Sequence, residues 1–255
     1  MKQTIKNRKG QNLVVLVEQT QSQKGLAFVM HGLGGFKEQV HIQTIAESFK
    51  ENSYTVVRFD TTNTFGESGG KYEDATTTNY YEDLEDVISW SSKQTWYQEP
   101  FCLIGHSLGG GCTVLYAENY PNKVKALAPI STVVSGKLRF EAHSKKELDE
   151  WQKTGWQIRE STSKPGVLKK LPWSHMEDCL EYDLLKKADR LTMPVLLIVG
   201  ENDKSTPLKH QKILYDKLPS KKELHIIKGA EHTFREKHHL QEIKEIFNNW
   251  IKKLD

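Results

Sequence analysis

Residues 101–111 constrain the fold of this chain most strongly, because a short apolar run ends there among closely spaced glycines. The residues before these glycines are apolar, as in a buried strand, and the small residues after them are compatible with a helix. Gly105 and Gly109 flank Ser107 at positions where a Cβ would clash with a neighbouring strand or helix. The stretch therefore predicts a strand, a strained turn that lifts Ser107 above the sheet edge, and a helix.

The Gly-x-Ser-x-Gly spacing of residues 105–109 is typical of a nucleophile elbow when a strand precedes it and a helix follows. In such a turn the serine Oγ is exposed, and the backbone N–H groups that open the helix point toward developing negative charge. Five-residue patterns with three fixed positions also arise by chance. The apolar strand before Ser107 and the small residues after it favour the elbow over a chance match.

Apolar runs typical of strands alternate with segments of helical periodicity along most of the chain. The expected strands are residues 4–7, 13–18, 26–30, 54–59, 101–104, 124–130, 194–200 and 223–227, and the expected helices are residues 40–52, 79–90, 112–119, 209–218 and 240–254. The first two strands would form an N-terminal hairpin. The alternation predicts an α/β fold, with a mostly parallel central sheet and helices on both faces.

The alternation stops between residues 131 and 190, where the chain becomes polar and irregular. Helical patterns persist there at residues 145–151 and 176–187. The stretch also carries three tryptophans, Trp151, Trp156 and Trp173. Because it is short and the sheet pattern resumes after it, we expect one domain over residues 1–255 with a small inserted cap at about 131–190.

A serine hydroxyl becomes a useful nucleophile only when a base removes its proton, so the elbow requires a histidine nearby. Among the ten histidines, His232 fits best because it follows the last strand, where the sheet edge that carries Ser107 is expected. His225 lies within that strand and is expected to pack. His238 and His239 open the last helix and are expected to be solvated.

An acid must then hold the imidazole, and Asp203 follows the preceding strand. The chain order Ser107, Asp203, His232 is the order that α/β-hydrolase triads follow. Glu201, in the same loop, is the alternative acid. Asp60 also ends a strand but precedes the serine, so we expect it to bond backbone amides of nearby loops rather than to react.

The negative charge of a tetrahedral intermediate requires two hydrogen-bond donors. One is the backbone N–H of Leu108, directly after the serine. The glycine-rich loop at residues 31–36 follows a buried strand, and the N–H of Leu33 is expected to be the second donor. His31, at the start of that loop, is expected to brace it rather than to act as a second base.

Taken together, these motifs resemble the α/β-hydrolase superfamily over nearly the whole chain. The matching pieces are His31-Gly32-Leu33-Gly34, Arg58-Phe59-Asp60 with Gly66-Glu67-Ser68-Gly69-Gly70, Gly105-His106-Ser107-Leu108-Gly109, residues 200–203 and Gly229-Ala230-Glu231-His232. Within the superfamily the chain is similar to bacterial carboxylesterases near the feruloyl (cinnamoyl) esterases and to serine aminopeptidase-like, S33-type hydrolases. The resemblance implies ester hydrolysis through an acyl-serine, without a cofactor or a metal. It also implies a Ser107–Asp203–His232 triad and an oxyanion hole at Leu33 and Leu108.

The resemblance says least about the cap, and it is the cap that sets substrate preference in such proteins. Four aromatic residues are expected to bind substrate, namely Phe36, Trp151, Trp156 and Trp173. The tryptophans could line an acyl pocket together with Phe140. The tryptophans could equally anchor the cap to the sheet. Where feruloyl esterases carry a glycine-bearing loop, this chain has residues 62–65, Thr-Asn-Thr-Phe, so an aromatic substrate is a weaker expectation than the ester bond.

The composition argues against several classes of partner. Lysine and arginine number 36 and aspartate and glutamate 33, a formal net charge of +3, and the basic residues are dispersed rather than gathered as in a nucleic-acid-binding protein. The chain has no signal-peptide core and no apolar run of membrane-spanning length, roughly 20 residues. Three unpaired cysteines, Cys102, Cys112 and Cys179, suit a reducing compartment. We therefore expect a cytoplasmic protein, a monomer or homodimer, whose partner is a small-molecule ester.

Two other functions remain open at this stage. The same triad could cleave an amide, a thioester or an acylglycerol, as an aminopeptidase, thioesterase or monoacylglycerol lipase does. An aminopeptidase would need a carboxylate near the pocket, and the cap offers Glu141, Glu147, Asp149 and Glu177. The fold could also serve a non-catalytic ligand-binding protein, although a complete triad argues against it. Dehalogenase chemistry is disfavoured because it needs an aspartate in place of Ser107.

Overall fold

The computed structural model describes residues 1–161, 164, 166–219 and 221–254, and within them a sheet of eight strands forms the centre. Its strands are β1 (Lys2–Lys6), β2 (Asn12–Glu18), β3 (Gly25–Met30), β4 (Tyr54–Asp60), β5 (Phe101–His106), β6 (Val124–Ile130), β9 (Val195–Gly200) and β10 (Lys222–Ile227). They lie in the order β1-β2-β4-β3-β5-β6-β9-β10. Strand β2 is antiparallel to β1 and β4, and the remaining neighbours are parallel. The predicted α/β fold and the N-terminal hairpin are confirmed.

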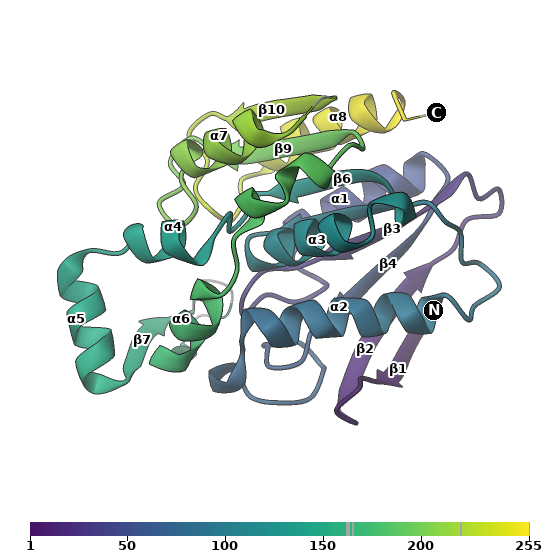
Figure 1. The fold of residues 1–255 in the computed structure, drawn as a ribbon. Coiled ribbons are helices and arrows are strands. Elements are labelled where there is room, and N and C mark those ends of the chain that lie inside the picture. The colour runs from purple at the N-terminus through teal and green to yellow at the C-terminus, as the bar shows by residue number, and fades with distance from the viewer. Residues whose placement is uncertain (162–163, 165, 220, 255) are drawn as a thin grey trace.

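Helices cover both faces of this sheet (Figure 1). They are α1 (Val40–Glu51), α2 (Thr77–Ser91), α3 (Leu108–Asn119), α7 (Leu208–Lys217) and α8 (Lys237–Ile251). Helices α1 and α8 bury apolar side chains on one face, and α2, α3 and α7 on the other. In β3 the side chains alternate between the two cores: Phe28 faces α2 and α3, and Val29 faces α1 and α8. Because each face is covered, the strand is apolar throughout, as its sequence indicates.

Between β6 and β9 the chain leaves the sheet at the carboxyl ends of the strands and forms the cap, on the left in Figure 1. Its elements are α4 (Gly136–Glu141), α5 (Lys145–Thr154), β7 (Trp156–Glu160), β8 (Leu168–Pro172) and α6 (Trp173–Leu180). The helix expected at residues 145–151 is present. The one expected at 176–187 lies earlier and ends at Leu180, before two single-turn 3₁₀ helices, Leu184–Lys186 and Ala188–Arg190.

The antiparallel hairpin of β7 and β8 has no counterpart in the sequence-based expectations. Most of its residues are exposed and polar, so the alternation of apolar and polar residues that marks a half-buried strand is missing.

The expectation that His239 is solvated was wrong, because this residue is buried and its Nε2 lies 3.1 Å from the carbonyl oxygen of Lys228. The last helix begins at Lys237, three residues before its expected start, and so carries His239 inward.

Trp151 holds the elements of the cap together and joins the cap to the sheet domain. Its side chain is buried, and its Nε1–H donates a hydrogen bond to the carbonyl of Leu171 at 3.0 Å. Trp151 packs in one cluster with Leu171, Met176 and Tyr72, the last of which begins a 3₁₀ helix (Tyr72–Asp74) between β4 and α2. Of the two roles left open for the tryptophans, Trp151 therefore has the anchoring one.

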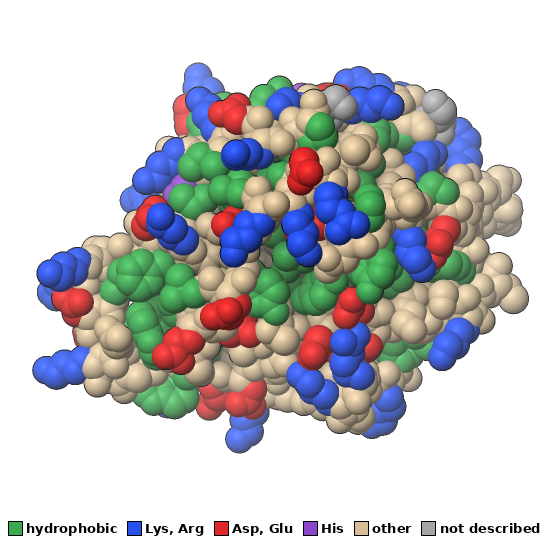
Figure 2. Space-filling view, viewed as in Figure 1, with side chains coloured by type: hydrophobic (Ala, Val, Ile, Leu, Met, Phe, Trp, Pro, Cys, Tyr) green, Lys and Arg blue, Asp and Glu red, His purple; other side chains and the backbone are tan. Residues whose placement is uncertain are grey.

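Charged side chains of both signs are interspersed over the face in Figure 2, in keeping with the dispersed charge of the sequence. Along the described part of the chain, no helix has the length and apolar composition that crossing a bilayer requires.

A buried ion pair joins the loop after β3 to the loop after β4. Lys37 Nζ lies 2.8 Å from Asp60 Oδ2, and both side chains are fully buried. The backbone N–H groups of Lys37 and Glu67 donate to the two Asp60 oxygens at 2.7 and 2.8 Å. Burial alone would lower the pKa of Lys37, but its bonds to Asp60 and Glu67 outweigh burial and raise it. Asp60 therefore organises both loops, as the sequence predicts.

Replacing Lys37 with methionine should destabilise the protein by roughly 3–5 kcal/mol, because the Asp60 carboxylate would remain buried without a cation. Urea unfolding measures this loss. The control is Lys9→Met, which removes an exposed ion pair with Glu82 and should cost no more than about 1 kcal/mol. Equal, small losses in both variants would show that the buried pair does not hold the loops.

Candidate active site

Ser107 occupies a strained turn between β5 and α3. Its backbone has φ 56° and ψ −118°, a region that residues other than glycine rarely adopt. A Cβ on Gly105 would lie 2.3 Å from the carbonyl oxygen of Gly109, and a Cβ on Gly109 would lie 2.2 Å from that of His31. The Ser107 N–H donates to the carbonyl of Ile130 at 2.9 Å, which fixes the turn against β6. The sequence pattern thus predicts both the turn and the reason for its glycines.

The structure brings Ser107, His232 and Asp203 together at the carboxyl edge of the sheet. His232 Nε2 lies 2.9 Å from Ser107 Oγ, and His232 Nδ1 lies 2.8 Å from Asp203 Oδ2. Ser107 follows β5, Asp203 follows β9 and His232 follows β10. Three side chains that are far apart in sequence thus form one continuous hydrogen-bonded chain.

Asp203 is held as an anion by several donors. The backbone N–H groups of Ser205 and Thr206 each donate to its Oδ1 at 2.9 Å. Burial would raise the pKa of Asp203, but the hydrogen bond and charge of His232 and the bonds from Thr206 outweigh it, and the pKa lies below its ordinary value. Glu201, the alternative acid, is exposed and instead accepts the N–H of Gly229 at 2.8 Å.

His106 holds the backbone of the loop that carries His232, a contact that the sequence analysis missed. Its Nε2 lies 2.9 Å from the carbonyl oxygen of His232, so Nε2 carries the proton and donates. Burial lowers the pKa of His106 to about 3, which keeps the ring neutral. The imidazole packs between His41 and His232, with ring centroids 4.6 and 4.9 Å away. The only sequence signal was its place inside the Gly-His-Ser motif.

The loop after β3 approaches the serine closely. A Cβ on Gly32 would lie 2.8 Å from the Ser107 Cβ. His31 braces this loop as expected: its Nε2 accepts the N–H of Thr61 at 3.1 Å, and its Nδ1 lies 2.8 Å from the carbonyl oxygen of Gly32. Burial lowers the pKa of His31 and keeps it neutral.

Leu33 and Leu108 border the same cavity as Ser107. Among the described residues, neither backbone N–H donates to a protein acceptor. The N–H of Leu108 opens α3, and the first N–H groups of a helix lack partners within it. Both amides are therefore available to an oxygen of a bound molecule.

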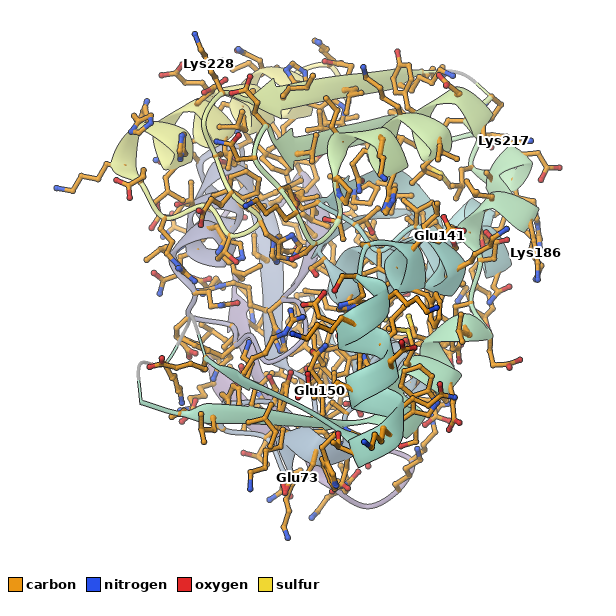
Figure 3. The ribbon with its side chains drawn as sticks, turned by 90° about the vertical axis from the view of Figure 1, so that its left-hand side faces the viewer. Glu73, Glu141, Glu150, Lys186, Lys217 and Lys228 are labelled. Atoms are coloured by element: carbon orange, nitrogen blue, oxygen red, sulfur yellow. The ribbon has the colours of Figure 1, made fainter. Side chains whose placement is uncertain are left out.

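A cavity of about 510 Å³ lies over Ser107 between the sheet edge and the cap. Figure 3 looks onto this side, with Glu141 marking the end of α4 and Glu150 marking α5. None of the four expected substrate-binding aromatics is among its described lining residues. Phe36 lies beneath Lys164, Trp151 fills the core of the cap, Trp156 is 43% exposed, and Trp173 packs edge-on against Trp151.

The carboxylates of Glu38, Asp60 and Glu67 lie close enough together to hold a cation. Lys37 Nζ lies among them, 2.9, 2.8 and 2.5 Å from their nearest oxygens. The lysine ammonium therefore balances this cluster.

A family model described as Hydrolase_4, serine aminopeptidase, S33, matches residues 21–237. The chain belongs to this family. Its relatives include the mitochondrial palmitoyl-protein thioesterase ABHD10 of Bos taurus, 26% identical over 82% of this chain and 67% of that protein. An uncharacterized 31.7 kDa protein from Escherichia coli is 26% identical over 89% of this chain and 90% of its own length.

Solved structures confirm the α/β-hydrolase fold. Mouse ABHD10 superimposes with a TM-score of 0.83 at 21% identity and covers all of both chains. Est1E from Butyrivibrio proteoclasticus, solved with ferulic acid bound, has a TM-score of 0.81 at 21% identity over 99% of this chain and 98% of its own. The chain is thus an α/β serine hydrolase of the S33 family, and its sequence relatives include proteins named as palmitoyl-protein thioesterases.

Replacing Gly105 with alanine should destabilise the S33 hydrolase, because the new Cβ would meet the Gly109 carbonyl inside van der Waals contact. A loss of at least about 1–3 kcal/mol is expected from urea unfolding. In the control, Gly69→Ala, the nearest atom to the new Cβ is 3.6 Å away, so little change is expected. A Gly105→Ala variant as stable as Gly69→Ala would contradict the packing described for the turn.

Proposed function

We propose that this protein hydrolyses carboxylic esters of small molecules through an acyl-serine intermediate. Ser107 is the nucleophile, His232 the general base and then acid, and Asp203 the group that orients the imidazole. The hydrogen-bonded chain from Ser107 Oγ through His232 to Asp203, with distances of 2.9 and 2.8 Å, carries this proposal. Its position at the base of a cavity gives a substrate access to the hydroxyl.

In the first half of the reaction, Ser107 Oγ attacks the ester carbonyl carbon while its proton moves to His232 Nε2. The carbonyl oxygen becomes an oxyanion, and the N–H groups of Leu33 and Leu108 donate to it. Collapse of the tetrahedral intermediate breaks the bond to the alcohol, which takes the proton from His232. A water molecule then repeats the sequence on the acyl-serine and releases the acid.

Asp203 fixes which imidazole nitrogen can act as the base. Its carboxylate accepts a hydrogen bond from Nδ1–H, so the lone pair of Nε2 points toward Ser107. The same negative charge stabilises the imidazolium that forms when the serine proton is taken up. His106 positions the loop through its hydrogen bond to the His232 carbonyl and packs beside the His232 ring.

A thioester substrate is the second candidate, and it rests on the thioesterase relatives. The same nucleophile, base and oxyanion donors would form the same acyl-serine. An aminopeptidase receives less support, because the one cavity carboxylate among its four candidates, Glu147, is already paired with Arg159 at 2.8 Å. A non-catalytic binding role would leave the close Ser107–His232 contact without a purpose.

Ser107→Ala should lower kcat for 4-nitrophenyl butyrate at least ~10³-fold, because the acyl-enzyme cannot form. It should also abolish labelling by a fluorophosphonate probe. In the wild type, peptide mapping should locate that label on Ser107. The control Ser22→Ala changes an exposed loop serine and should hydrolyse and label as the wild type does. Unchanged turnover in Ser107→Ala would reject the proposal.

Asp203→Asn should lower kcat by about 10³–10⁴-fold, because the amide can donate to Nδ1 and favour the wrong imidazole tautomer. Glu201→Gln, the matched change in the same loop, should leave turnover unchanged. Stopped-flow or steady-state assays with 4-nitrophenyl esters measure both. If Glu201→Gln lost activity and Asp203→Asn kept it, the assignment of the acid would be reversed.

A further inference from the structure

The cavity over Ser107 is lined by an excess of positive charge. Five cationic side chains and two carboxylates contribute to the wall among the described residues. The cations are Arg139, Arg159, Lys169, Lys204 and Arg235, and the carboxylates are Glu147 and Glu160. The chain as a whole is nearly balanced, with 36 basic against 33 acidic residues. The imbalance is therefore a local property of this site.

Both wall carboxylates are already engaged. Glu147 pairs with Arg159 at 2.8 Å, and Glu160 accepts the N–H of Gly166 at 3.3 Å. The other four wall cations have no carboxylate partner within the described ranges. Two arginines outside the cavity, Arg8 and Arg58, contrast with these cations because each binds acidic side chains.

Lys169 is one of the two half-buried cations in the cavity wall. It lies on β8, half-buried, with its Nζ 5.9 and 5.8 Å from the stacked rings of Phe65 and Tyr72. Its Cε would lie 3.3 Å from a Cβ on Gly34, so it approaches the loop that carries Leu33. Burial lowers the pKa of Lys169, and the positive charge of Arg235 lowers it further. Lys169 and Arg235 thus both contribute positive charge to the cavity wall, and neither has a carboxylate partner among the described residues.

Arg139 and Arg235 reach the same cavity from other elements. Arg139 lies on α4, half-buried, and the only described hydrogen bond of its side chain is a weak one, from Nη1 to Cys179 Sγ at 3.7 Å. Arg235 follows His232 in the loop before α8. Like charges gathered at a partly desolvated site destabilise one another unless an anion binds between them. Arginine also offers the paired N–H groups that suit carboxylate and phosphate oxygens.

We propose that the ester cleaved at Ser107 carries an anionic group, a carboxylate or a phosphate, which Lys169, Arg235 and Arg139 bind. This inference rests on the proposed ester hydrolysis and narrows its substrate class. The anionic group would lie on the cap side of the cavity, while the ester carbonyl faces Leu33 and Leu108. A free amine would be repelled by the same cations, in agreement with the weaker support for an aminopeptidase.

Pairs of esters that differ in one charged group test this proposal. One pair is 3-acetoxybenzoate and its methyl ester, with the charge on the alcohol side. A second is the 4-nitrophenyl monoester of adipic acid and 4-nitrophenyl hexanoate, with the charge on the acyl side. A third arm, 3-acetoxyphenyl phosphate against phenyl acetate, separates phosphate from carboxylate. The wild type should show kcat/KM higher by ~10-fold or more for the charged member of at least one pair.

The Lys169→Met and Arg235→Met variants should lower that charged-to-neutral ratio by ~10-fold or more. Lys170→Met is the matched control, because Lys170 is the exposed neighbour on β8 and does not line the cavity. It should keep the wild-type ratio. Lys169→Gln provides a second removal of the charge, and thermal unfolding shows that each variant is folded. A ratio at or below one for every pair, or one unchanged in both cavity variants, would overturn the proposal.

Binding to the Ser107→Ala variant separates failure of this inference from failure of the proposed function. Calorimetry with 3-acetoxybenzoate, the adipate monoester, 3-acetoxyphenyl phosphate and their neutral partners needs no turnover. Tighter binding of a charged member, lost in Ser107→Ala/Lys169→Met, would support the anion site even if the wild type cleaved no ester. Equal binding within every pair would reject the anion site, even if the wild type cleaved esters and took up the fluorophosphonate at Ser107.

Discussion

The close contact between the Ser107 turn and the loop after β3 is the constraint on which the site depends. At Gly105 and Gly109 the backbones approach so closely that no Cβ fits. This packing holds Ser107 in its strained conformation and sets Gly32 against its side chain. It therefore places the nucleophile and the two candidate oxyanion donors in one rigid unit. The Lys37–Asp60 ion pair further fixes this arrangement, because it ties the loop after β3 to the end of β4.

Electrostatics then distinguishes the groups gathered at this edge. His31 and His106 are buried, have lowered pKa values and serve as neutral braces. Asp203 is buried too, yet its donors keep it ionised. The cations of the cavity wall differ from both kinds, because no protein anion balances Lys169 or Arg235 in the described structure. Asp203 and the two neutral histidines thus have their partners within the protein. The cations of the cavity wall, by contrast, would be balanced by a ligand of negative charge.

Strand ends explain why Ser107, Asp203 and His232 could be predicted from the sequence. Each follows an apolar run, and the carboxyl ends of parallel strands meet at one edge, so their order and position sufficed. The hairpin of β7 and β8 carries no such pattern, because it is exposed on most of its surface. The cavity cations could not be recognised either. Lys169 looks like any other of the 36 basic residues until the cap brings it over the serine, and Trp151 proved to fill the core of the cap.

The central claim is that Ser107 becomes covalently acylated during turnover. Mass spectrometry of the protein, quenched in acid while it hydrolyses a slowly deacylating 4-nitrophenyl ester, tests this most directly. The account predicts a mass increase equal to the acyl group, located by peptide mapping on Ser107 and absent from Ser107→Ala. An acyl group on another residue, or steady hydrolysis with no adduct at any quench time and an unimpaired Ser107→Ala variant, would contradict it.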